Sequence, residues 1–273
     1  MKLKDKVALI TGGAQGLGKA VAVAMAKEGA NIVLCDINET TLSEAAKEIE
    51  ATGRECLPVI CDVSSRESVD QMFANAAKRF GTVHILINNA SVLPTRPVDH
   101  ERRNRQYETK GKGEPKSFGF TTSHSDEDWL RYWDVNVHGV FYCTRAALRL
   151  MEPQRYGKII NIASVAGLWT ESAFTPGYAA SKAAVISYTK NSAFDVAGGN
   201  IYVNCIAAGA IMTPPLRKYL AEATEEQKRA FLSFMPIGRV AEPEEYASLA
   251  VYLAADGHYL VGQIISPNGG AVM

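Results

Sequence analysis

The stretch Val7-Ala8-Leu9-Ile10-Thr11-Gly12-Gly13-Ala14-Gln15-Gly16-Leu17-Gly18 decides the fold. An apolar run leads directly into a glycine-rich turn, and a helical pattern follows from Leu17. Such a turn lets the backbone approach a pyrophosphate, while the N-terminus of the helix supplies free N–H groups and the positive end of a dipole. The spacing Gly12-x-x-x-Gly16-x-Gly18 differs from the commoner Gly-x-Gly-x-x-Gly. Its position between a strand and a helix is what predicts a dinucleotide site.

Short apolar runs alternate with longer helical patterns along most of the chain, which is typical of βαβ units and a parallel sheet. The runs expected to form strands are Val7–Ile10, Asn31–Cys35, Glu55–Cys61, His84–Ile87, Lys158–Ile162, Ile201–Ile206 and Gln263–Ser266. The segments expected to form helices are about Leu17–Glu28, Thr40–Thr52, Ser65–Arg79, Asp126–Met151, Tyr178–Val196 and Pro243–Ala255. We therefore predict an α/β fold in which a single domain, residues 1–273, contains a doubly wound (Rossmann) parallel sheet of about seven strands with helices on both faces.

Two stretches break this alternation. Residues 95–125 show no periodic apolar pattern and are predicted to form a long, charged, flexible loop. Residues 213–235 form an amphipathic stretch bounded by prolines that follows a predicted strand. Because ligands of doubly wound sheets lie outside the carboxyl ends of the strands, this second stretch is placed to act as a lid. The alternative is a surface helix that only packs on the core.

Composition restricts the class of ligand. The chain has 29 basic and 29 acidic residues, which argues against nucleic-acid or membrane-surface binding through a positive field and favours a small-molecule ligand. No apolar run reaches the length of about 18 residues that spans a bilayer. The first predicted strand begins at Val7 and leaves no space for a signal peptide. We expect a soluble, cytoplasmic protein.

The five cysteines, at positions 35, 56, 61, 143 and 205, show neither a CxxC pair nor the Cys/His spacing of a metal site. We expect buried or half-buried free thiols in a reducing compartment and no bound metal. Cys143 lies in an apolar context that offers no base, so a nucleophilic role is not expected.

Tyr178 and Lys182 are the best candidates for catalytic chemistry. Tyr178 is the only tyrosine in the chain with a lysine four residues further on, and residues at this spacing share one face of a helix. A neighbouring ammonium favours the phenolate and is expected to lower the pKa of the phenol from its usual value of about 10. A tyrosine in this state exchanges protons readily with an alcohol or a carbonyl. The alternative is an ordinary pair on a helix surface.

Asp36, at the end of the second predicted strand, bears on cofactor choice. A carboxylate here can accept hydrogen bonds from the adenosine ribose hydroxyls and repel a 2′-phosphate, which selects NAD over NADP. Neither Gln15 nor Ile37 is basic, so the usual cations of a phosphate site are missing. Lys19 could be recruited, but a solvated helix lysine is the simpler interpretation. The segments Asp62-Val63 and Asn88-Asn89-Ala90 end the next strands along the same edge.

From Lys6 to Gly270 the chain resembles the short-chain dehydrogenase/reductase family. The resemblance rests on six ordered motifs: Thr11-Gly12-x-x-x-Gly16-x-Gly18, Asp62-Val63, Asn88-Asn89-Ala90, Asp134-Val135-Asn136-Val137-x-Gly139, Asn161-Ile162-Ala163-Ser164 and Tyr178-Ala179-Ala180-Ser181-Lys182. It implies a nicotinamide cofactor, which Asp36 predicts to be NAD, and the interconversion of a secondary alcohol and a ketone.

The resemblance also implies roles for individual residues. Tyr178 would be the general acid and base, Ser164 would hydrogen-bond the reacting oxygen, Lys182 would bind the nicotinamide ribose and Asn136 would hold a water. The implied cofactor-binding residues are Gly12, Gln15, Gly16, Leu17, Gly18, Asp36, Ile37, Asp62, Val63, Asn89, Ala90, Tyr178, Lys182, Gly209, Ile211 and Thr213. The implied substrate-binding residues are Ser164, Val165, Trp169, Phe174, Tyr178, Ala210 and Leu216. The apolar members of this substrate-binding set favour a hydrophobic, cyclic or aromatic substrate.

The chain departs from the family pattern at several positions. Ser91, Ala208 and Asn268 stand where glycine, proline and aspartate are usual, and residues 95–125 lengthen a connection beside the active-site mouth. That insertion carries seven arginine and lysine residues against four acidic ones. The excess could meet a carboxylate or the phosphates of an acyl-CoA, or it could simply be solvated.

Three classes of function stay open at this stage. The leading one is an NAD-dependent alcohol dehydrogenase, and the second is a 3-oxoacyl reductase or hydroxyacyl-CoA dehydrogenase that acts on carrier-protein or CoA thioesters. The third is a non-catalytic relative that keeps the nucleotide fold. The family resemblance further implies a homodimer or homotetramer formed through the helices at 126–151 and 178–196 and through the C-terminal strand. The apolar residues Val140, Phe141 and Ala147 would lie either in that contact or against the sheet.

Overall fold

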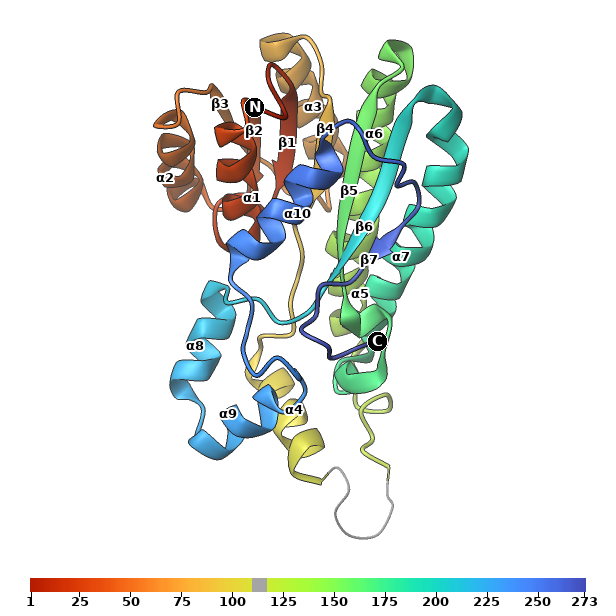
Figure 1. The fold of residues 1–273 in the computed structure, drawn as a ribbon. Helices are drawn as coiled ribbons and strands as arrows, with labels where there is room; N and C mark the ends of the chain where they lie inside the picture. The colour runs from red at the N-terminus through yellow and green to blue at the C-terminus, as the bar shows by residue number, and fades with distance from the viewer. Residues whose placement is uncertain (110–116) are drawn as a thin grey trace.

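The computed structural model describes residues 1–109 and 117–273, and its centre is a seven-stranded sheet in which every pair of neighbouring strands is parallel (Figure 1). The strand order is β3-β2-β1-β4-β5-β6-β7. The strands are β1 (Val7–Thr11), β2 (Asn31–Asp36), β3 (Cys56–Ile60), β4 (Ile85–Asn88), β5 (Gly157–Ser164), β6 (Ile201–Ala208) and β7 (Ile264–Ile265). The predicted doubly wound α/β fold is confirmed.

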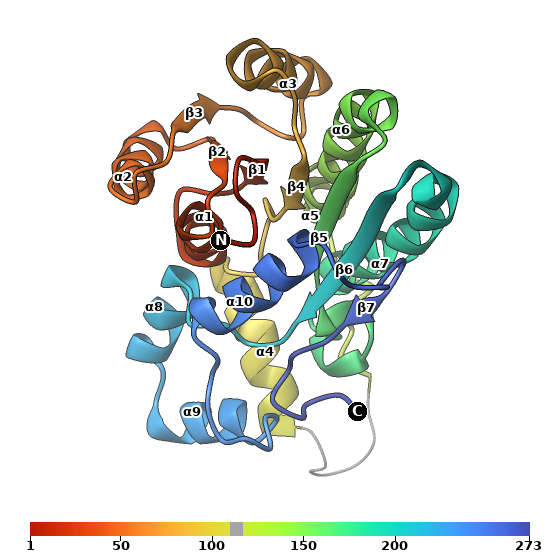
Figure 2. The ribbon, with the colours of Figure 1, turned by 45° about the horizontal axis from the view of Figure 1, so that its top comes forward.

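Helices cover both faces of this sheet, as Figure 2 shows, with α1, α2 and α10 on one face and α3, α6 and α7 on the other. The α-helices are α1 (Gly16–Lys27), α2 (Glu39–Glu50), α3 (Arg66–Phe80), α4 (Pro97–Thr109), α5 (Asp126–Trp133), α6 (Val140–Gln154), α7 (Pro176–Val196), α8 (Pro214–Glu222), α9 (Glu225–Leu232) and α10 (Pro243–Ala254). Shorter helical turns are η1 (Asp134–Gly139, π-helical), η2 (Val165–Gly167), η3 (Thr170–Ser172) and η4 (Ala197–Gly199).

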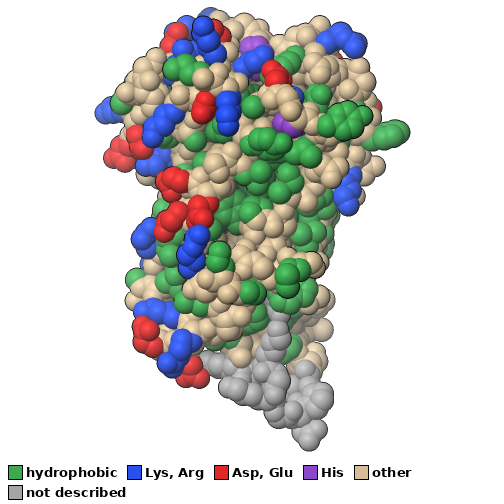
Figure 3. All heavy atoms as spheres, viewed as in Figure 1, with side chains coloured by type: hydrophobic (Ala, Val, Ile, Leu, Met, Phe, Trp, Pro, Cys, Tyr) green, Lys and Arg blue, Asp and Glu red, His purple; other side chains and the backbone are tan. Residues whose placement is uncertain are grey.

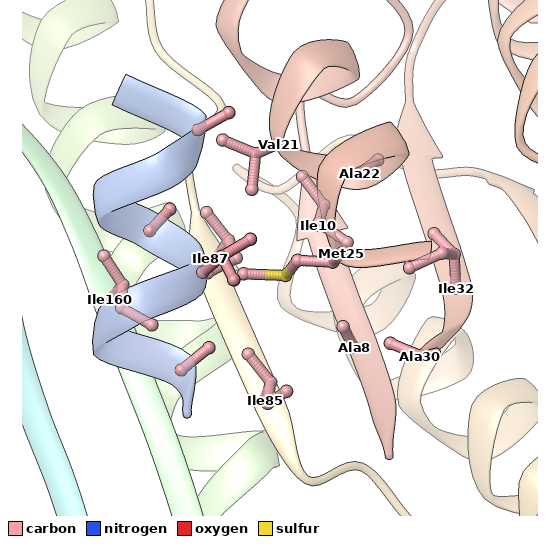
Figure 4. Packing of buried hydrophobic residues seen from close by; sticks show 14 of the residues in the cluster. Ala8, Ile10, Val21, Ala22, Met25, Ala30, Ile32, Ile85, Ile87 and Ile160 are labelled. Carbon is pink, nitrogen blue, oxygen red and sulfur yellow. The ribbon is translucent and has the colours of Figure 1, made fainter. Parts of the chain in front are cut away.

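The core on one face lies between the central strands and the helices α1 and α10 (Figure 4). Met25 of α1 reaches toward Ile87 of β4, and Ala8 and Ile10 of β1 lie close by. All five residues of β1 are buried. A strand covered on both faces is a continuous apolar run and not an alternating one, which is why Val7–Ile10 predicted this strand from the sequence.

Side-chain caps fix where two of the helices begin. The Oδ1 of Asn38 accepts a hydrogen bond from the Thr41 N–H (3.1 Å) at the start of α2, and the Oγ of Ser65 accepts one from the Ser68 N–H (3.2 Å) at the start of α3. Helix α1 differs, because its N-cap residue Gln15 makes no side-chain capping bond. The first N–H groups of α1 are therefore left for other partners.

The prediction of a flexible loop over residues 95–125 is wrong for its first part, which forms helix α4. The face of α4 that packs inward is polar: Asp99 is completely buried, Gln106 is 6% exposed, and Arg103 lies between them at helical spacing. A search for apolar periodicity misses a helix of this kind. Three basic residues of the predicted cationic loop, Lys110, Lys112 and Lys116, lie outside the described residues.

The predicted helix over 126–151 is in fact α5, η1 and α6 in succession. The π-helical turn η1 carries Asn136, and π-helical turns are frequent at functional sites. Helix α6 also continues through Pro153 to Gln154, because a proline in the last turn removes only one helical hydrogen bond. Helix α7 begins at Pro176, two residues earlier than predicted, since proline suits the first position of a helix.

Residues 213–235 contain the two short helices α8 and α9. A capping box in which Thr224 and Gln227 hydrogen-bond each other's backbone begins α9. Figures 1 and 2 show that α4, α8 and α9 lie together at one end of the sheet. The predicted lid segment and the insertion are thus neighbours.

The five cysteines are free thiols, and four of them are buried. Burial raises the pKa of the Cys143 thiol, which agrees with its expected inertness. Within residues 1–109 and 117–273, none of the helices has the length and apolar character that crossing a bilayer requires. Figure 3 shows charged side chains mostly along one edge of the molecule and hydrophobic ones gathered over α10 and the neighbouring strands.

Candidate active site

A cleft of about 580 Å³ lies at the carboxyl ends of the strands, where the strand order reverses between β1 and β4. This is where doubly wound sheets bind ligands. The cleft brings together every residue that the sequence predicted for cofactor binding, together with Ser164. Those residues are Gly12, Gln15, Gly16, Leu17, Gly18, Asp36, Ile37, Asp62, Val63, Asn89, Ala90, Tyr178, Lys182, Gly209, Ile211 and Thr213.

The glycine-rich turn has no room for larger side chains. Gly12 has a φ of +62°, and a Cβ atom there would lie 2.8 Å from the Cα of Ala90. A Cβ atom on Gly18 would lie 2.1 Å from the carbonyl oxygen of Gly12. The turn therefore folds back closely on itself, and the uncapped N-terminus of α1 opens into the cleft behind it. Free N–H groups at a helix N-terminus beside a closely packed turn fit a pyrophosphate.

Hydrogen bonds from the segment that follows β4 hold the glycine-rich turn in place. The side-chain Nδ2 of Asn89 donates to the carbonyl oxygens of Thr11 (3.0 Å) and Gly12 (2.8 Å). In return, the Oγ1 of Thr11 accepts the N–H groups of Asn89 and Ala90, each at 3.1 Å. The predicted cofactor residues after β1 and β4 are thus parts of one network.

Asp36 lies at the tip of β2 with its carboxylate turned toward the glycine turn. Its Oδ2 accepts the Ala14 N–H and its Oδ1 accepts the Asn38 N–H, both at 3.1 Å. Next to it the side chain of Ile37 is 71% exposed. A fixed negative charge at this position suits ribose hydroxyls and opposes a phosphate.

Tyr178 and Ser164 meet at the other end of the cleft. Ser164 is the last residue of β5, and its hydroxyl hydrogen-bonds the phenol of Tyr178, which comes from the first turn of α7. The same Ser164 oxygen accepts the Ala166 N–H at 3.1 Å, which fixes the orientation of the hydroxyl group. The pair is a preformed polar site for one carbonyl or alcohol oxygen.

The expected effect of Lys182 on the tyrosine differs from what the structure contains. Burial raises the pKa of the Tyr178 phenol, and the hydrogen bond from Ser164 is the influence that lowers it. The ammonium of Lys182 lies 5.8 Å from the centre of the tyrosine ring and donates to the carbonyl oxygen of Ile162 at 3.0 Å. Burial lowers the pKa of Lys182 itself to about 8.

Asn136 is completely buried and lines neither the cleft nor the cavity described next. Its Oδ1 accepts from the Val92 N–H (2.8 Å) and the Ser91 hydroxyl (3.1 Å). Its Nδ2 donates to the Val92 carbonyl (3.2 Å) and the Ser181 hydroxyl (3.1 Å). Because protein groups use both its donors and its acceptor, the side chain joins the segment after β4 to α7 and has no donor left for a water.

A second cavity of about 240 Å³ adjoins the cleft, and Tyr178 lines both. Every residue predicted for substrate binding lines it except Ser164, which lines only the cleft. Those residues are Val165, Trp169, Phe174, Tyr178, Ala210 and Leu216. Its remaining wall comes mainly from α4 and from α8 and α9.

His100, Arg103 and Tyr107 of α4 also line this cavity. The sequence predicted Arg103 only as one of several basic residues that could meet an anion, and it did not predict His100 or Tyr107 as site residues. Their spacing of three and four residues is helical and was a usable signal. This spacing did not lead to a predicted helix because the segment lacks apolar periodicity. The insertion is therefore part of the wall of the substrate cavity.

A cleft that fits a dinucleotide and meets a small cavity at a tyrosine, with a serine beside it, is typical of a dinucleotide-dependent oxidoreductase. A family model described as short chain dehydrogenase matches residues 6–224. The chain belongs to the short-chain dehydrogenase/reductase family, as its motifs predicted. It is an oxidoreductase that acts on CH–OH and keto groups and uses a nicotinamide cofactor.

Several known proteins are similar over the whole length. The chain is 35% identical over 274 residues, 100% of both chains, to the 3-oxoacyl-(acyl-carrier-protein) reductase FabG of Thermotoga maritima. It is 32% identical to the 7alpha-hydroxysteroid dehydrogenase of Escherichia coli, with 100% of this chain and 96% of that protein covered. The crystal structure of levodione reductase superposes with a TM-score of 0.83 at 30% identity and covers 98% of both chains.

Proposed function

We propose that this chain is an NAD-dependent dehydrogenase/reductase that interconverts a hydrophobic, cyclic or aromatic secondary alcohol and its ketone. The observation that carries the proposal is the meeting of the nucleotide cleft and the apolar cavity at Tyr178. A substrate carbon in the cavity would lie beside the cleft, with its oxygen within reach of the Tyr178 and Ser164 hydroxyls. The bound cofactor supplies or accepts the hydride.

In this proposal the protein handles the proton and the orientation of the substrate. Tyr178 gives a proton to the carbonyl oxygen in reduction and takes it from the alcohol in oxidation. Ser164 hydrogen-bonds the same oxygen and keeps the substrate in line. Lys182 holds the nicotinamide ribose, and Asn136 acts through packing because its side chain fixes α7 to the segment after β4.

NAD is the proposed cofactor because of Asp36. Its carboxylate is held by two backbone N–H groups beside the glycine turn, where a 2′-phosphate would lie. Ile37, which follows it, provides no positive charge. The cofactor choice is therefore proposed to follow from repulsion of the phosphate by this carboxylate.

A second candidate is a 3-oxoacyl reductase or hydroxyacyl-CoA dehydrogenase that acts on thioesters. The 35% identity to a 3-oxoacyl-(acyl-carrier-protein) reductase favours it. The mostly apolar cavity and Asp36 favour the leading proposal. So does the 32% identity to a 7alpha-hydroxysteroid dehydrogenase, because steroids are cyclic and hydrophobic.

The deciding experiment measures absorbance at the nicotinamide band. NAD and NADP would each be combined with a panel of cyclic and aromatic secondary alcohols, and NADH and NADPH with the matching ketones and with acetoacetyl-CoA. We expect turnover of the cyclic and aromatic compounds with NAD. Turnover of the thioester alone, with NADPH, would instead establish the second candidate.

We also propose a homo-oligomer that forms through the helices α5, α6 and α7. Large hydrophobic side chains are exposed there, among them Leu130 (55%), Phe141 (40%) and Phe194 (91%). Val140 and Ala147 are buried in the core, so of the three candidates only Phe141 is available for such a contact. The five free thiols support the proposal of a cytoplasmic, reducing environment.

A further inference from the structure

Helix α4 contributes the only permanent charge among the described residues that line the substrate cavity, the guanidinium of Arg103. The rest of that lining is apolar, aromatic or neutral and polar, apart from the titratable His100 and the tyrosines. A charge kept in a mostly apolar cavity is costly unless something there uses it. The inference drawn from it rests on the proposed function and names the substrate class more closely.

Two aromatic rings hold the Arg103 side chain in the cavity wall. Its guanidinium carbon lies 5.0 Å from the ring centre of Phe174 and 4.9 Å from that of Tyr219. One nitrogen donates to the Pro94 carbonyl oxygen at 3.2 Å. These contacts join the insertion to the segment before α7 and to α8, and they leave further N–H donors of the same fork unassigned.

No carboxylate forms an ion pair with Arg103 in the part of the chain that the structure describes. The acidic residue Asp99, one turn earlier on α4, pairs instead with Arg131 at 3.6 Å. A positive charge between aromatic rings, without a described counterion, is a strong site for an anion.

The neighbouring arginines of the insertion point elsewhere. Arg102 donates to the Ser123 carbonyl oxygen at 2.7 Å, and Arg105 donates to the Phe118 carbonyl oxygen and lies over the ring of Phe120. Neither of them lines the cavity. Among the described basic residues of the insertion, Arg103 is therefore the one that lines the substrate cavity.

We propose that Arg103 determines substrate specificity by binding a carboxylate, so that the enzyme acts on hydrophobic oxo acids and the corresponding hydroxy acids. The carboxylate of the substrate would lie against α4. Its apolar part would fill the cavity, and its carbonyl carbon would lie beside Tyr178. The volume of about 240 Å³ is below the range of about 300–1,000 Å³ that is usual for drug-sized ligands, which suits a small free acid.

The test compares an acid with its own neutral ester. The probes are benzoylpropionate and oxocyclohexanecarboxylate, each beside its methyl ester, with NADH as reductant. We expect the wild-type enzyme to reduce the acids with a kcat/KM at least about tenfold above that of the esters. A charge-assisted hydrogen bond of about 1.5–3 kcal/mol corresponds to roughly 10- to 150-fold.

The variant Arg103→Gln removes the charge but keeps a donor for the Pro94 carbonyl. We expect the acid-to-ester ratio of kcat/KM to fall to about one. Arg103→Lys keeps the charge without the planar fork and should fall between the two. Arg102→Gln and Arg105→Gln on the same helix are the matched controls, and their acid-to-ester ratios should equal that of the wild type.

Three outcomes would overturn the proposal. The first is a wild-type enzyme that does not distinguish acid from ester, and the second is an Arg103→Gln variant that loses the same factor for both, because Arg103 would then only brace the cavity wall. The third is that Arg103 binds a phosphate group of CoA. In that case Arg103→Gln would lower kcat/KM for acetoacetyl-CoA, but it would not lower kcat/KM for the N-acetylcysteamine thioester of acetoacetate or for the acids. In each case, continued reduction of the esters that depends on Tyr178 would leave the proposed function standing.

Discussion

Tyr178 is the residue on which the proposed chemistry depends, and its surroundings in the fold change how it must work. Since burial raises the pKa of the phenol, the neutral form dominates and is ready to give a proton to a ketone. Tyr178→Phe removes that proton and keeps the ring contact with Tyr132, whose ring centre lies 5.8 Å away. We expect turnover to fall by about 10²–10⁴-fold, the usual contribution of general acid–base catalysis.

Steady-state kinetics in both directions would check this expectation, with a cofactor-binding titration as the control. The variant should bind NADH normally, because the phenol oxygen makes no contribution to the glycine turn or to Asp36. Near-normal turnover by Tyr178→Phe would remove the residue from its assigned role.

Asp36 carries the prediction for cofactor choice. The wild-type enzyme should prefer NAD, and the double variant Asp36→Asn with Ile37→Arg should move the ratio of kcat/KM for NADP over NAD upward by roughly tenfold or more, about 1.4 kcal/mol. Asparagine keeps an acceptor for the Ala14 N–H while it removes the negative charge. Ile37 is largely exposed, so an arginine there has room to reach a phosphate. Initial rates with both cofactors measure the ratio, and an unchanged ratio would show that this carboxylate does not select the cofactor.

The sequence predicted which residues line the cleft better than it predicted the pKa values of those residues. Most of the predicted cofactor residues lie at the end of a strand or open a helix, so the topology alone brings Gly12, Asp36 and Asn89 to one edge. The pKa of Tyr178 was not predictable in the same way. It depends on how deeply the phenol is buried and on where the Lys182 ammonium points, and both are set by packing between α7 and β5.

Among the elements, α4 was the one the sequence did not predict. A helix is normally recognised by an apolar stripe, whereas α4 packs inward with Asp99, Arg103 and Gln106. Their partners come from elsewhere in the fold: the Phe174 N–H donates to the Gln106 side chain at 3.1 Å, and Arg131 pairs with Asp99 at 3.6 Å. A polar inward face can be recognised only when the partners are known, which requires the folded structure.

A variant of Asn136 tests the hydrogen bonds that join η1 to α7. In Asn136→Asp a carboxylate oxygen replaces the donor Nδ2. It faces the Val92 carbonyl oxygen with no hydrogen between them, and the hydrogen bond to the Ser181 hydroxyl is lost. We expect the free energy of unfolding to fall by about 1–3 kcal/mol, the cost of leaving buried polar groups unsatisfied. Urea unfolding measures this, and Ser91→Ala is the control because it removes only one partner of the Asn136 Oδ1. A variant as stable as the wild type would show that these hydrogen bonds contribute little.

For the molecule as a whole, the sheet was predictable because its inner strands β1, β2, β4, β5 and β6 are mostly buried and appear as apolar runs. The assembly was not, since a sequence does not say which apolar side chains of α6 face the sheet. The structure separates buried Val140 from exposed Phe141. Phe141 is therefore the residue of α6 at which the predicted subunit contact can be tested.

We expect Phe141→Glu to weaken or abolish self-association. A charge in an interface that excludes water is unfavourable, whereas on a monomer surface it is well tolerated. Size-exclusion chromatography with light scattering would compare the wild type, Phe141→Glu and the control Tyr259→Glu, an exposed residue away from α6. If the wild type is a monomer, or if Phe141→Glu has the same mass as the wild-type oligomer, this contact is not the one used.

The pH dependence of stability is also a property of the whole molecule, and His84 gives a way to test it. Burial first and Lys6 second lower the pKa of His84 below its usual value, and burial likewise lowers the pKa of His100 and His124. The folded state then binds fewer protons than the unfolded one. Stability should therefore be full above about pH 6.5, the unfolded value, and fall as the pH drops below it.

His84→Asn should make that fall shallower. The neutral imidazole of His84 accepts the Val7 N–H on its Nδ1 at 3.0 Å, at the start of β1, and protonation would remove this acceptor. The Oδ1 of asparagine occupies a similar position and does not titrate. Urea unfolding at pH 8.0 and at about pH 5.5 should give a smaller difference in free energy for the variant. The remaining difference comes from other titrating groups, among them His100, His124 and Lys182. An equal difference in both proteins would mean that protonation of His84 does not break the hydrogen bond that begins the central strand.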